Sequence, residues 1–270
     1  ANQHGRAAEH DHRIARGKLA LEHIGWTHIG KATGDHERLV VACEKVVIAA
    51  RKAGVKRCVI LNSYFAYFDR VWPEKKLAER HPYIRCRVEQ AERTIAAGAG
   101  EMDVMILELP YIFGSMPHRI PLWKNVMLDR FAKGRVVFFP KGGTNMLAVR
   151  HVGEAVIDAL ENGKHGMRYP VGDENHTFKE MMAMLLEAKG TPKKIIGVPS
   201  VFTQLGGIFI SMGFRRKGLE SGLNLRYLMR DIMADFCYFD PSESAKALGF
   251  GRGGLKEAIE DTIRACYPKN

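Results

Sequence analysis

A tyrosine and an arginine in this 270-residue chain have a spacing that suits proton transfer. Tyr83 and Arg87 stand at positions i and i+4, and side chains with that spacing lie on one face of a helix. A cation close to a phenol favours the phenolate, which lets a tyrosine donate or accept a proton near neutral pH. Ser63 ends an apolar run upstream, where its hydroxyl would hold a substrate oxygen. Ser63, Tyr83 and Arg87 are therefore the candidate catalytic residues.

The same residues also have a purely structural explanation. Any basic helix that contains a tyrosine can produce the YxxxR pattern by chance, and Tyr83 would then be a half-buried residue at the start of a helix. The catalytic hypothesis makes a geometric prediction that distinguishes a catalytic role of these residues from a structural one. The hydroxyls of Ser63 and Tyr83 should face one cleft, with Arg87 one turn along the same helix.

The segments before these residues alternate between helix and strand patterns. Asp35 can accept hydrogen bonds from the free amides of a helix start, and apolar residues follow at helical spacing as far as Gly54. Residues 58–61 form a short apolar run that is typical of a strand buried on both faces of a parallel sheet. Asn62 and Ser63 would then lie at the carboxyl end of this strand.

The alternation continues along the chain. A helix is predicted over residues 82–97 and a strand over residues 104–109, which Pro110 ends. Because consecutive βαβ units usually place their strands side by side, we expect segments 58–61 and 104–109 to be parallel neighbours flanked by the two helices. The pattern predicts an α/β fold that is doubly wound around a parallel sheet.

The chain after Gly114 is a mixture of short helices and strands. A loop is expected at Gly142 and Gly143, and the apolar segment 201–212, too short to span a bilayer, indicates a buried or interface helix. The predicted helices are 123–132, 151–161 and 177–188, with Thr177 capping the last of them, and the predicted strands are 136–139, 167–171 and 194–198.

Residues 1–34 show poor periodicity, and we interpret most of them as loop. His10, Asp11 and His12 have the donor types of a metal site, but no second pair of ligands matches them, so no metal is expected. The 5 cysteines are scattered and never form a CxxC pair, so neither a disulfide framework nor a zinc site is expected.

The net charge of +11 attracts anions of any kind, and its distribution is more informative than its sign. Basic residues gather within 75–93 and at 215–217 without interleaved aromatics, so nucleic acid is not expected as a partner. No apolar run reaches the ~18 to 20 residues of a membrane helix, and the N-terminus lacks the apolar core of a signal peptide. We expect a cytoplasmic protein without a membrane partner.

Several segments, in the same order, resemble the extended short-chain dehydrogenase/reductase family, which includes nucleotide-sugar epimerases and dehydratases. Residues 62–67 (NSYFAY) resemble the SSxxVY segment of that family, and residues 83–92 resemble its YxxSKxxAE helix. The other matching segments are a strand end at 26–30, a helix-to-strand junction at 49–57, the turn at 109–114 beside the nicotinamide, a helix at 152–160 and a late element at 239–250.

This resemblance implies a Rossmann-like fold, with a core over residues 1–150 and a smaller mixed substrate-binding region over residues 151–270 that partly returns to the core. It implies NAD or NADP as the cofactor and a carbinol or ketone as the substrate, such as a group on a nucleotide sugar. A homodimer is left open. Catalysis would fall to Ser63, Tyr83 and Arg87, and the cofactor would be bound by Gly30, Lys31, Asn62, Tyr83, Arg87, Pro110 and Ile112.

The sequence also departs from the family pattern. Arg87 replaces the family's lysine, Glu108 replaces a usual arginine, and Arg150 and His151 stand where acidic residues are common. No GxxGxxG occurs anywhere in the 270 residues, so the opening βαβ unit that holds the pyrophosphate is expected to be missing and dinucleotide binding to be weak. Two hypotheses stay open: an NAD(P)-dependent enzyme, or a non-catalytic binding or regulatory protein on the same scaffold.

Overall fold

Parallel strands form the central sheet of the molecule. The computed structural model describes residues 18–21, 29–30, 37–117, 119–199 and 220–268. Within these residues the sheet has the strand order β1, β3, β4, β8, and every pairing is parallel. The predicted neighbours 58–61 and 104–109 are confirmed, because they form β3 and β4. The four strands are β1 (Lys18–Leu21), β3 (Arg57–Ser63), β4 (Asp103–Leu109) and β8 (Arg168–Pro170).

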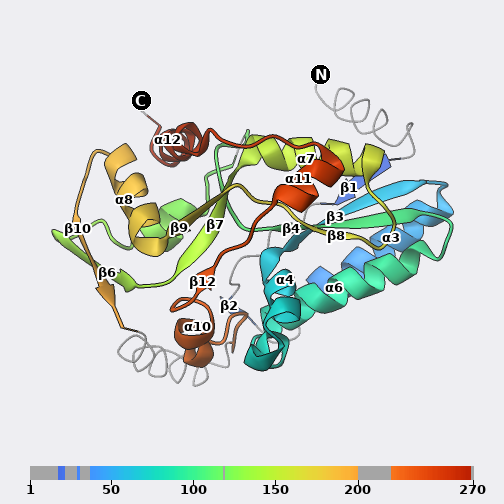
Figure 1. Cartoon of the computed structure of the whole chain (residues 1–270), viewed down its shortest axis with the longest axis horizontal. Coiled ribbons are helices and arrows are strands. Elements are labelled where there is room, and N and C mark those ends of the chain that lie inside the picture. The colour runs from blue at the N-terminus through green and yellow to red at the C-terminus, as the bar shows by residue number, and fades with distance from the viewer. Residues whose placement is uncertain (1–17, 22–28, 31–36, 118, 200–219, 269–270) are drawn as a thin grey trace.

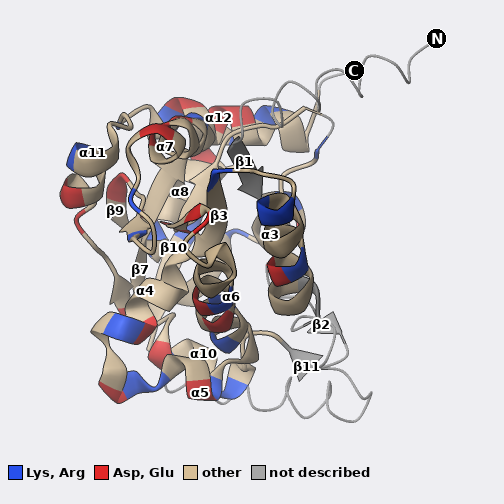
Figure 2. Ribbon diagram, turned by 90° about the vertical axis from the view of Figure 1, so that its right-hand side faces the viewer, with Lys and Arg blue, Asp and Glu red and all other residues tan. Residues whose placement is uncertain are grey.

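Helices cover both faces of this sheet, as the doubly wound pattern requires (Figure 1). Helices α3 (Ala42–Lys52) and α6 (Pro82–Gly98) pack on one face, and α7 (Val149–Asn162) packs on the other. Successive residues of β3 point to opposite faces, so Cys58 joins the apolar cluster under α3 and α6, whereas Val59 joins the cluster under α7. Figure 2 shows acidic and basic residues interspersed along α3 and α6 on the solvent side.

A second group of strands follows the central sheet. Strand β7 is its centre, between β5 and β12 in parallel and with β9 antiparallel. Two further strands, β6 and β10, form a parallel pair of their own. Helices α8 and α12 pack against this group in the largest apolar cluster. The elements are β5 (Tyr111–Phe113), β6 (Val136–Pro140), β7 (Gly143–Ala148), β9 (Glu174–Thr177), β10 (Lys194–Val198), β12 (Phe236–Cys237), α8 (Phe178–Ala188) and α12 (Leu255–Cys266).

Short elements complete the described chain. Among the predicted elements, the strands over 136–139, 167–171 and 194–198 and the helices over 151–161 and 177–188 are confirmed to within about two residues. Thr177 caps α8 in a reciprocal arrangement with Glu180, as expected. The remaining elements are α4 (Tyr64–Val71), α5 (Leu77–Arg80), α10 (Leu225–Asp231), α11 (Ser242–Leu248), the turns Glu37–Val41, Pro73–Lys75 and Lys124–Leu128, and the strands β2 (Ile29–Gly30) and β11 (Glu220–Ser221).

The loop predicted at Gly142 and Gly143 is confirmed only at Gly142, because Gly143 begins the buried strand β7. A buried strand is predicted from a continuous apolar run, and Thr144 and Asn145 interrupt that run. Both residues are nevertheless fully buried and hydrogen-bonded. A Cβ at Gly142 would overlap the carbonyl oxygen of Asp235, so glycine is needed for the close approach of these two segments. The polar residues of β7 therefore hid a strand from sequence periodicity.

Two other predicted segments differ from the structure. The helix expected over 123–132 is reduced to the π-type turn Lys124–Leu128, in which Asp129 N donates to Lys124 O. Residues 1–34 are not all loop, because β1 lies in the central sheet beside β3. Residues 29–30 pair antiparallel with β11 in a separate two-stranded sheet. The segment that resembled a strand end at 26–30 is therefore not the neighbour of β3.

Several expectations fall outside the described residues or stay predictions. His10, Asp11, His12, Asp35 and the segment 201–212 lie outside the described residues. The division at residue 150 stays a prediction, and the largest apolar cluster draws residues from both sides of it. All five cysteines are buried free thiols. In the described part of the chain, no helix has the length and apolarity needed to cross a membrane.

Candidate functional site

The carboxyl end of β3 carries Asn62 and Ser63, and both are buried. Asn62 Oδ1 accepts a hydrogen bond from Ser63 N at 2.6 Å, and Asn62 Nδ2 donates to Arg87 O at 2.9 Å. Ser63 Oγ accepts from Phe65 N at 3.3 Å and so caps the start of α4. Asn62 therefore ties the end of the strand to α6, and Ser63 keeps its own O–H available to donate.

Tyr83 and Arg87 lie on α6 with the geometry that their spacing predicts. Arg87 Nε donates to Tyr83 Oη at 3.1 Å, and the guanidinium carbon lies 5.2 Å from the centre of the tyrosine ring. Arg87 Nη1 donates to Gln90 Oε1 at 2.8 Å and lies 3.5 Å from Leu61 O on β3. Because only 4% of Tyr83 and 3% of Arg87 is exposed, the tyrosine does not point into solvent.

Tyr64, the residue after Ser63, is a second buried phenol in this part of the structure. Burial raises the pKa of Tyr64 well above its usual value, and its hydroxyl pairs with Thr144 Oγ1 at 2.8 Å. Tyr64 is thus a neutral buried phenol. A cleft shared by the Ser63 and Tyr83 hydroxyls stays a prediction.

His81 is a buried neighbour of this site that the sequence did not single out. It precedes the first residue of α6, and none of its surface is exposed. Its Nδ1 accepts from Asn224 N at 3.1 Å, so the ring hydrogen of the neutral form lies on Nε2, which has no hydrogen-bond partner within the described structure. Burial lowers the pKa of His81 to about 4. The imidazole beside Tyr83 is therefore uncharged at neutral pH.

Glu108, a departure from the family pattern, has a partner in the structure. It lies on β4 opposite Asn62 in the strand register and is fully buried. Arg70 of α4 donates to both carboxylate oxygens, at 2.6 and 2.7 Å, and also to Ala66 O at 3.1 Å. The fork-shaped pair fixes α4 against β4 beside the candidate site. The acidic residue at this position is thus neutralised by a cation 38 positions away in the sequence.

The other departure, Arg150 and His151, contacts a glycine-rich segment at 249–254 that fits the pattern GxGxxG. Arg150 Nη2 donates to Gly253 O at 2.6 Å, and His151 Nε2 lies 2.9 Å from the same oxygen. The segment follows helix α11 instead of a strand and opens α12. Two carboxylates of the chain, Asp173 and Glu154, accept from the amides of Gly253 and Gly251. These amides are already satisfied internally, so the segment is not a phosphate cradle.

Some of the residues predicted to bind the cofactor lie at one end of the central sheet, and others lie elsewhere in the fold. Pro110 follows β4, whose last residue is opposite Ser63 in the register, and Ile112 lies in the next strand, where its carbonyl accepts from Trp123 Nε1 at 2.7 Å. Asn62 and Pro110 therefore lie at the carboxyl edge of the central sheet, and Asn62 contacts helix α6, which carries Tyr83 and Arg87. Gly30 lies in the separate pairing of β2 with β11, and Lys31 is outside the described residues.

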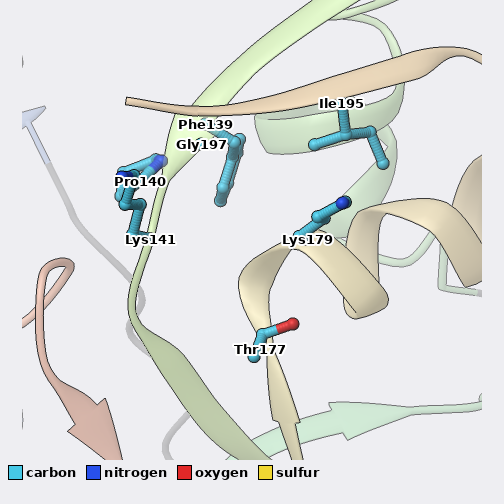
Figure 3. Close-up of a pocket in the computed structure, with 7 residues that line it drawn as sticks. All are labelled: Phe139, Pro140, Lys141, Thr177, Lys179, Ile195 and Gly197. Atoms are coloured by element: carbon cyan, nitrogen blue, oxygen red, sulfur yellow. The ribbon is translucent and has the colours of Figure 1, made fainter. Parts of the chain in front are cut away.

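A pocket of about 310 Å³ lies elsewhere, between the β6–β10 pair and the start of α8 (Figure 3). None of the predicted site residues lines it. Its walls combine apolar side chains with two lysines, and its lining residues are Phe139, Pro140, Lys141, Thr177, Lys179, Ile195 and Gly197. Size alone does not make this pocket the centre of chemistry, because its lining residues include no carboxylate or histidine that could pair with the two lysines as acid and base.

Comparison with known proteins supports the fold. No protein-family model matches the chain. Sterol demethylase protein B of Methylococcus capsulatus is 27% identical over 177 residues, which cover 62% of this chain and 54% of that protein. The chain thus spans about half the length of that relative.

Two solved structures resemble the whole described architecture. The crystal structure of gox2253 has a TM-score of 0.73 and 16% identity, covering 94% of this chain and 81% of that chain. The Bordetella bronchiseptica enzyme WbmH, solved in complex with NAD+, has a TM-score of 0.63 and 14% identity, covering 96% and 78%. Structural similarity at this level of sequence identity establishes the fold, and the chemistry must be argued from the residues of the site. The chain therefore shares the Rossmann-like fold of these two proteins, a parallel sheet with helices on both faces.

Proposed function

We propose that this protein is an NAD(P)-dependent oxidoreductase that acts on a carbinol or ketone, with Tyr83 as the residue that transfers the proton. The observation that carries the proposal is the hydrogen bond from Arg87 Nε to Tyr83 Oη, on a helix that Asn62 ties to the carboxyl end of β3. In open α/β sheets, ligands bind outside the carboxyl ends of the strands. The fold shared with WbmH, which was solved with NAD+, supports the same proposal.

The roles of the side chains follow from their hydrogen bonds. Tyr83 Oη already accepts from Arg87, so its own O–H is left to donate toward a substrate oxygen. Ser63 Oγ accepts from Phe65 N, so its O–H is likewise left to hold that oxygen. Tyr83 would give its proton to the oxygen when a ketone is reduced and take it back when a carbinol is oxidised. Arg87 orients the phenol from within the helix.

The dinucleotide, when bound, supplies the hydride acceptor or donor. Asn62 and Pro110 at this edge, Tyr83 and Arg87 on α6 and Ile112 in β5 are the residues that would hold its nicotinamide end. The fit to the pyrophosphate end is weaker, because the amides of Gly251 and Gly253 are already bound by internal carboxylates. Gly30 and Lys31 stay predictions for that part of the site. Weak dinucleotide affinity is the expectation that follows.

Two substrate classes are supported by different observations. The family resemblance of the segments around Ser63 and Tyr83 favours a carbinol or ketone on a nucleotide sugar. The relative from Methylococcus capsulatus is named as a sterol demethylase protein, which favours an apolar carbinol or ketone as the second candidate. The mixed region after residue 150 would hold either substrate. Both classes need the same proton transfer at Tyr83.

The alternative is a non-catalytic binding or regulatory protein. Capping of α4 by Ser63 and burial of Tyr83 in the largest apolar cluster are structural roles that such a protein would also keep. A thermal-shift titration with NAD and NADP separates the two hypotheses. A ligand that binds only the native state stabilises it by about 2.7 kcal/mol at a hundredfold excess over Kd. A saturable shift supports the enzyme, and no shift supports the alternative.

Tyr83→Phe tests the residue itself. Phenylalanine keeps the ring that packs against Arg87 and removes only the O–H, so turnover should fall by at least about 100-fold while the cofactor-induced shift remains. Tyr169→Phe is the matched control, because Tyr169 is equally buried but accepts from Lys164 N in a different core. Turnover is followed as NAD(P)H absorbance with a UDP-sugar and with a sterol. Full activity of Tyr83→Phe would contradict the assigned role.

A further inference from the structure

The pair of strands β6 and β10 exposes an apolar face that no described element covers. Val136, Phe138 and Ile196 are 39%, 62% and 37% exposed. The register places Phe138 opposite Ile196, and residues paired in parallel strands point to the same side. We call these three residues the outer β6–β10 face. Val137 and Phe139 alternate with them and are buried on the inner side.

The position of this face makes it accessible. The β6–β10 pair stands at the end of the molecule that lies opposite α3, as Figure 1 shows. It is a two-stranded sheet, so both strands are edges among the described strands. An exposed apolar sheet face with open edges is a liability that proteins normally cover or charge. Its persistence here indicates an interaction surface.

The charged residues of the two segments that contain these strands are all basic. Residues 130–141 and 189–199, which contain the two strands, include no aspartate or glutamate. Lys193 is held internally, because its Nζ donates to Phe131 O and Ala132 O at 2.6 Å. We call the exposed cations of these segments outside the pocket the cationic rim, and they are Arg130, Lys133, Arg135 and Lys194, of which Lys194 lies opposite Val136 on the outer side.

Additional cationic groups lie on the inner side of the same strands. Lys141 and Lys179 line the pocket between the strands and α8 (Figure 3). The nearest acidic residue of α8 in the sequence, Glu180, is engaged by the backbone amide and hydroxyl of Thr177. The strands that carry the apolar outer β6–β10 face thus bear basic residues on both sides and no acidic residue of their own.

We propose that the outer β6–β10 face docks on an anionic lipid bilayer, with Phe138 and Ile196 entering the boundary between headgroups and acyl chains. Apolar side chains with Lys and Arg beside them are the combination that binds this interface. The cationic rim then contacts lipid phosphates. The protein would lie on the bilayer through this face and not span it. The proposal rests on this surface alone and not on the proposed function.

A second copy of the chain is a poorer occupant of this face. A twofold interface places the same patch of both subunits face to face. The exposed cations of one rim would then oppose those of the other, and like charges brought together around an apolar contact repel one another. An anionic bilayer satisfies the apolar residues and the charges at the same time. Self-association therefore serves as an outcome that would overturn the proposal.

Vesicle flotation tests the proposal with the full chain. The protein is mixed with vesicles of phosphatidylcholine alone and with vesicles in which about a third of the lipid is phosphatidylglycerol. We expect flotation with the anionic vesicles and not with the neutral ones. Raising the salt from about 0.1 M to about 1 M shortens the Debye length from about 10 Å to about 3 Å and should release the protein.

Matched variants locate the contact. Phe138→Ser should weaken partitioning to anionic vesicles by roughly tenfold, since it removes most of the inserted aromatic area. Lys194→Gln should weaken it by about fivefold, the effect of one cation near an anionic surface. Ile157→Ser is the control, because Ile157 is 59% exposed on α7, away from the β6–β10 pair, and should leave partitioning unchanged. Thermal melts by circular dichroism confirm that each variant is folded.

A fluorescence measurement gives an independent readout. Phe138→Trp keeps an aromatic side chain at the centre of the face, so its emission should shift to the blue when anionic vesicles are added. Ile157→Trp should show no such shift. The parent spectrum, with its 3 tryptophans, is subtracted in both cases.

Several results would overturn the proposal. One is equal binding to neutral and anionic vesicles, and another is no binding to either. A third is a loss of binding with Ile157→Ser that matches the loss with Phe138→Ser. A fourth is light scattering that shows a parent dimer which Phe138→Ser converts to a monomer, because the face would then be an interface between copies of the chain.

Discussion

Replacing Arg70 by methionine should destabilise the protein by about 3 kcal/mol, because it leaves a buried carboxylate without its cation. Glu108 is fully buried and receives both of its short hydrogen bonds from Arg70, at 2.6 and 2.7 Å. Breaking a buried ion pair by removing one partner typically costs about 3 to 5 kcal/mol. The Arg70 side chain is 36% exposed, so water screens the pair and the lower end of that range applies.

A second cation limits the loss further. This cation is Arg168. Burial and the positive charge of Arg70 lower the pKa of Arg168, and the negative charge of Glu108 partly offsets that lowering. After Arg70→Met, the Arg168 charge still stabilises part of the Glu108 charge. Glu108→Gln should cost only about 1 kcal/mol, because the amide oxygen still accepts a hydrogen bond and Arg70 reaches water.

The double variant Arg70→Met, Glu108→Leu removes both charges. Apolar replacement of a buried ion pair is often neutral or stabilising, so the double variant should be more stable than Arg70→Met alone. Equilibrium unfolding in urea, followed by far-ultraviolet circular dichroism, gives the free energies of all variants. Glu79→Gln is the control, because its pair with Lys76 is 69% and 58% exposed and should be worth less than about 0.5 kcal/mol.

The reasoning would be refuted by a loss of less than about 1 kcal/mol for Arg70→Met, since that is the size of an exposed pair. A double variant that is less stable than Arg70→Met would also contradict it, because the buried charge would then not be the cause. The expected non-additivity of the two substitutions is the signature of direct contact between the side chains.

Two further predictions concern stability. Burial lowers the pKa of His81 to about 4, below the usual 6.5, so its contribution is complete above pH 6.5 and is lost as the pH falls toward 4. The free energy of unfolding should drop by about 2 kcal/mol between pH 7 and pH 5. His81→Asn keeps an acceptor for Asn224 N and should remove most of this pH dependence. If the slope of stability against pH is unchanged in the variant, His81 is not its source. Gly142→Ala should destabilise the protein by about 3 kcal/mol, because the added Cβ would overlap Asp235 O. Gly153→Ala in α7 has open space around the added Cβ and should stabilise the protein by about 1 kcal/mol. Equal melting temperatures of the two variants would contradict this prediction.

The part of the fold nearest the candidate site was predictable from local patterns. An apolar run with polar residues at its end predicted β3, and helical spacing after Pro82 predicted α6 and with it the Tyr83–Arg87 contact. These features depend on residues close together in the chain, whose hydrogen bonds and side-chain directions follow from the backbone repeat. Thr177 as the cap of α8 is another example, because its partner Glu180 is three residues away.

Other features needed contacts that the sequence does not display. Strand β7 was missed because Thr144 and Asn145 are polar, and only their distant partners, such as Tyr64 and Asn175, make them acceptable in a core. Strand β1 was missed because it is short and lies in a region of poor periodicity, so its pairing with β3 identifies it. Tertiary context overrides local propensity most strongly in such short strands.

The sequence by itself determined the α/β order of elements and the identity of the residues that could transfer a proton. Tertiary structure alone decided what surrounds them. It pairs Glu108 with Arg70 and leaves Phe138 exposed. It also places Glu154 and Asp173 where they accept hydrogen bonds from the amides of Gly251 and Gly253. The physical reason is that helix and strand periodicity is a local property of the backbone, whereas charge pairing and burial depend on which distant segments the fold brings together.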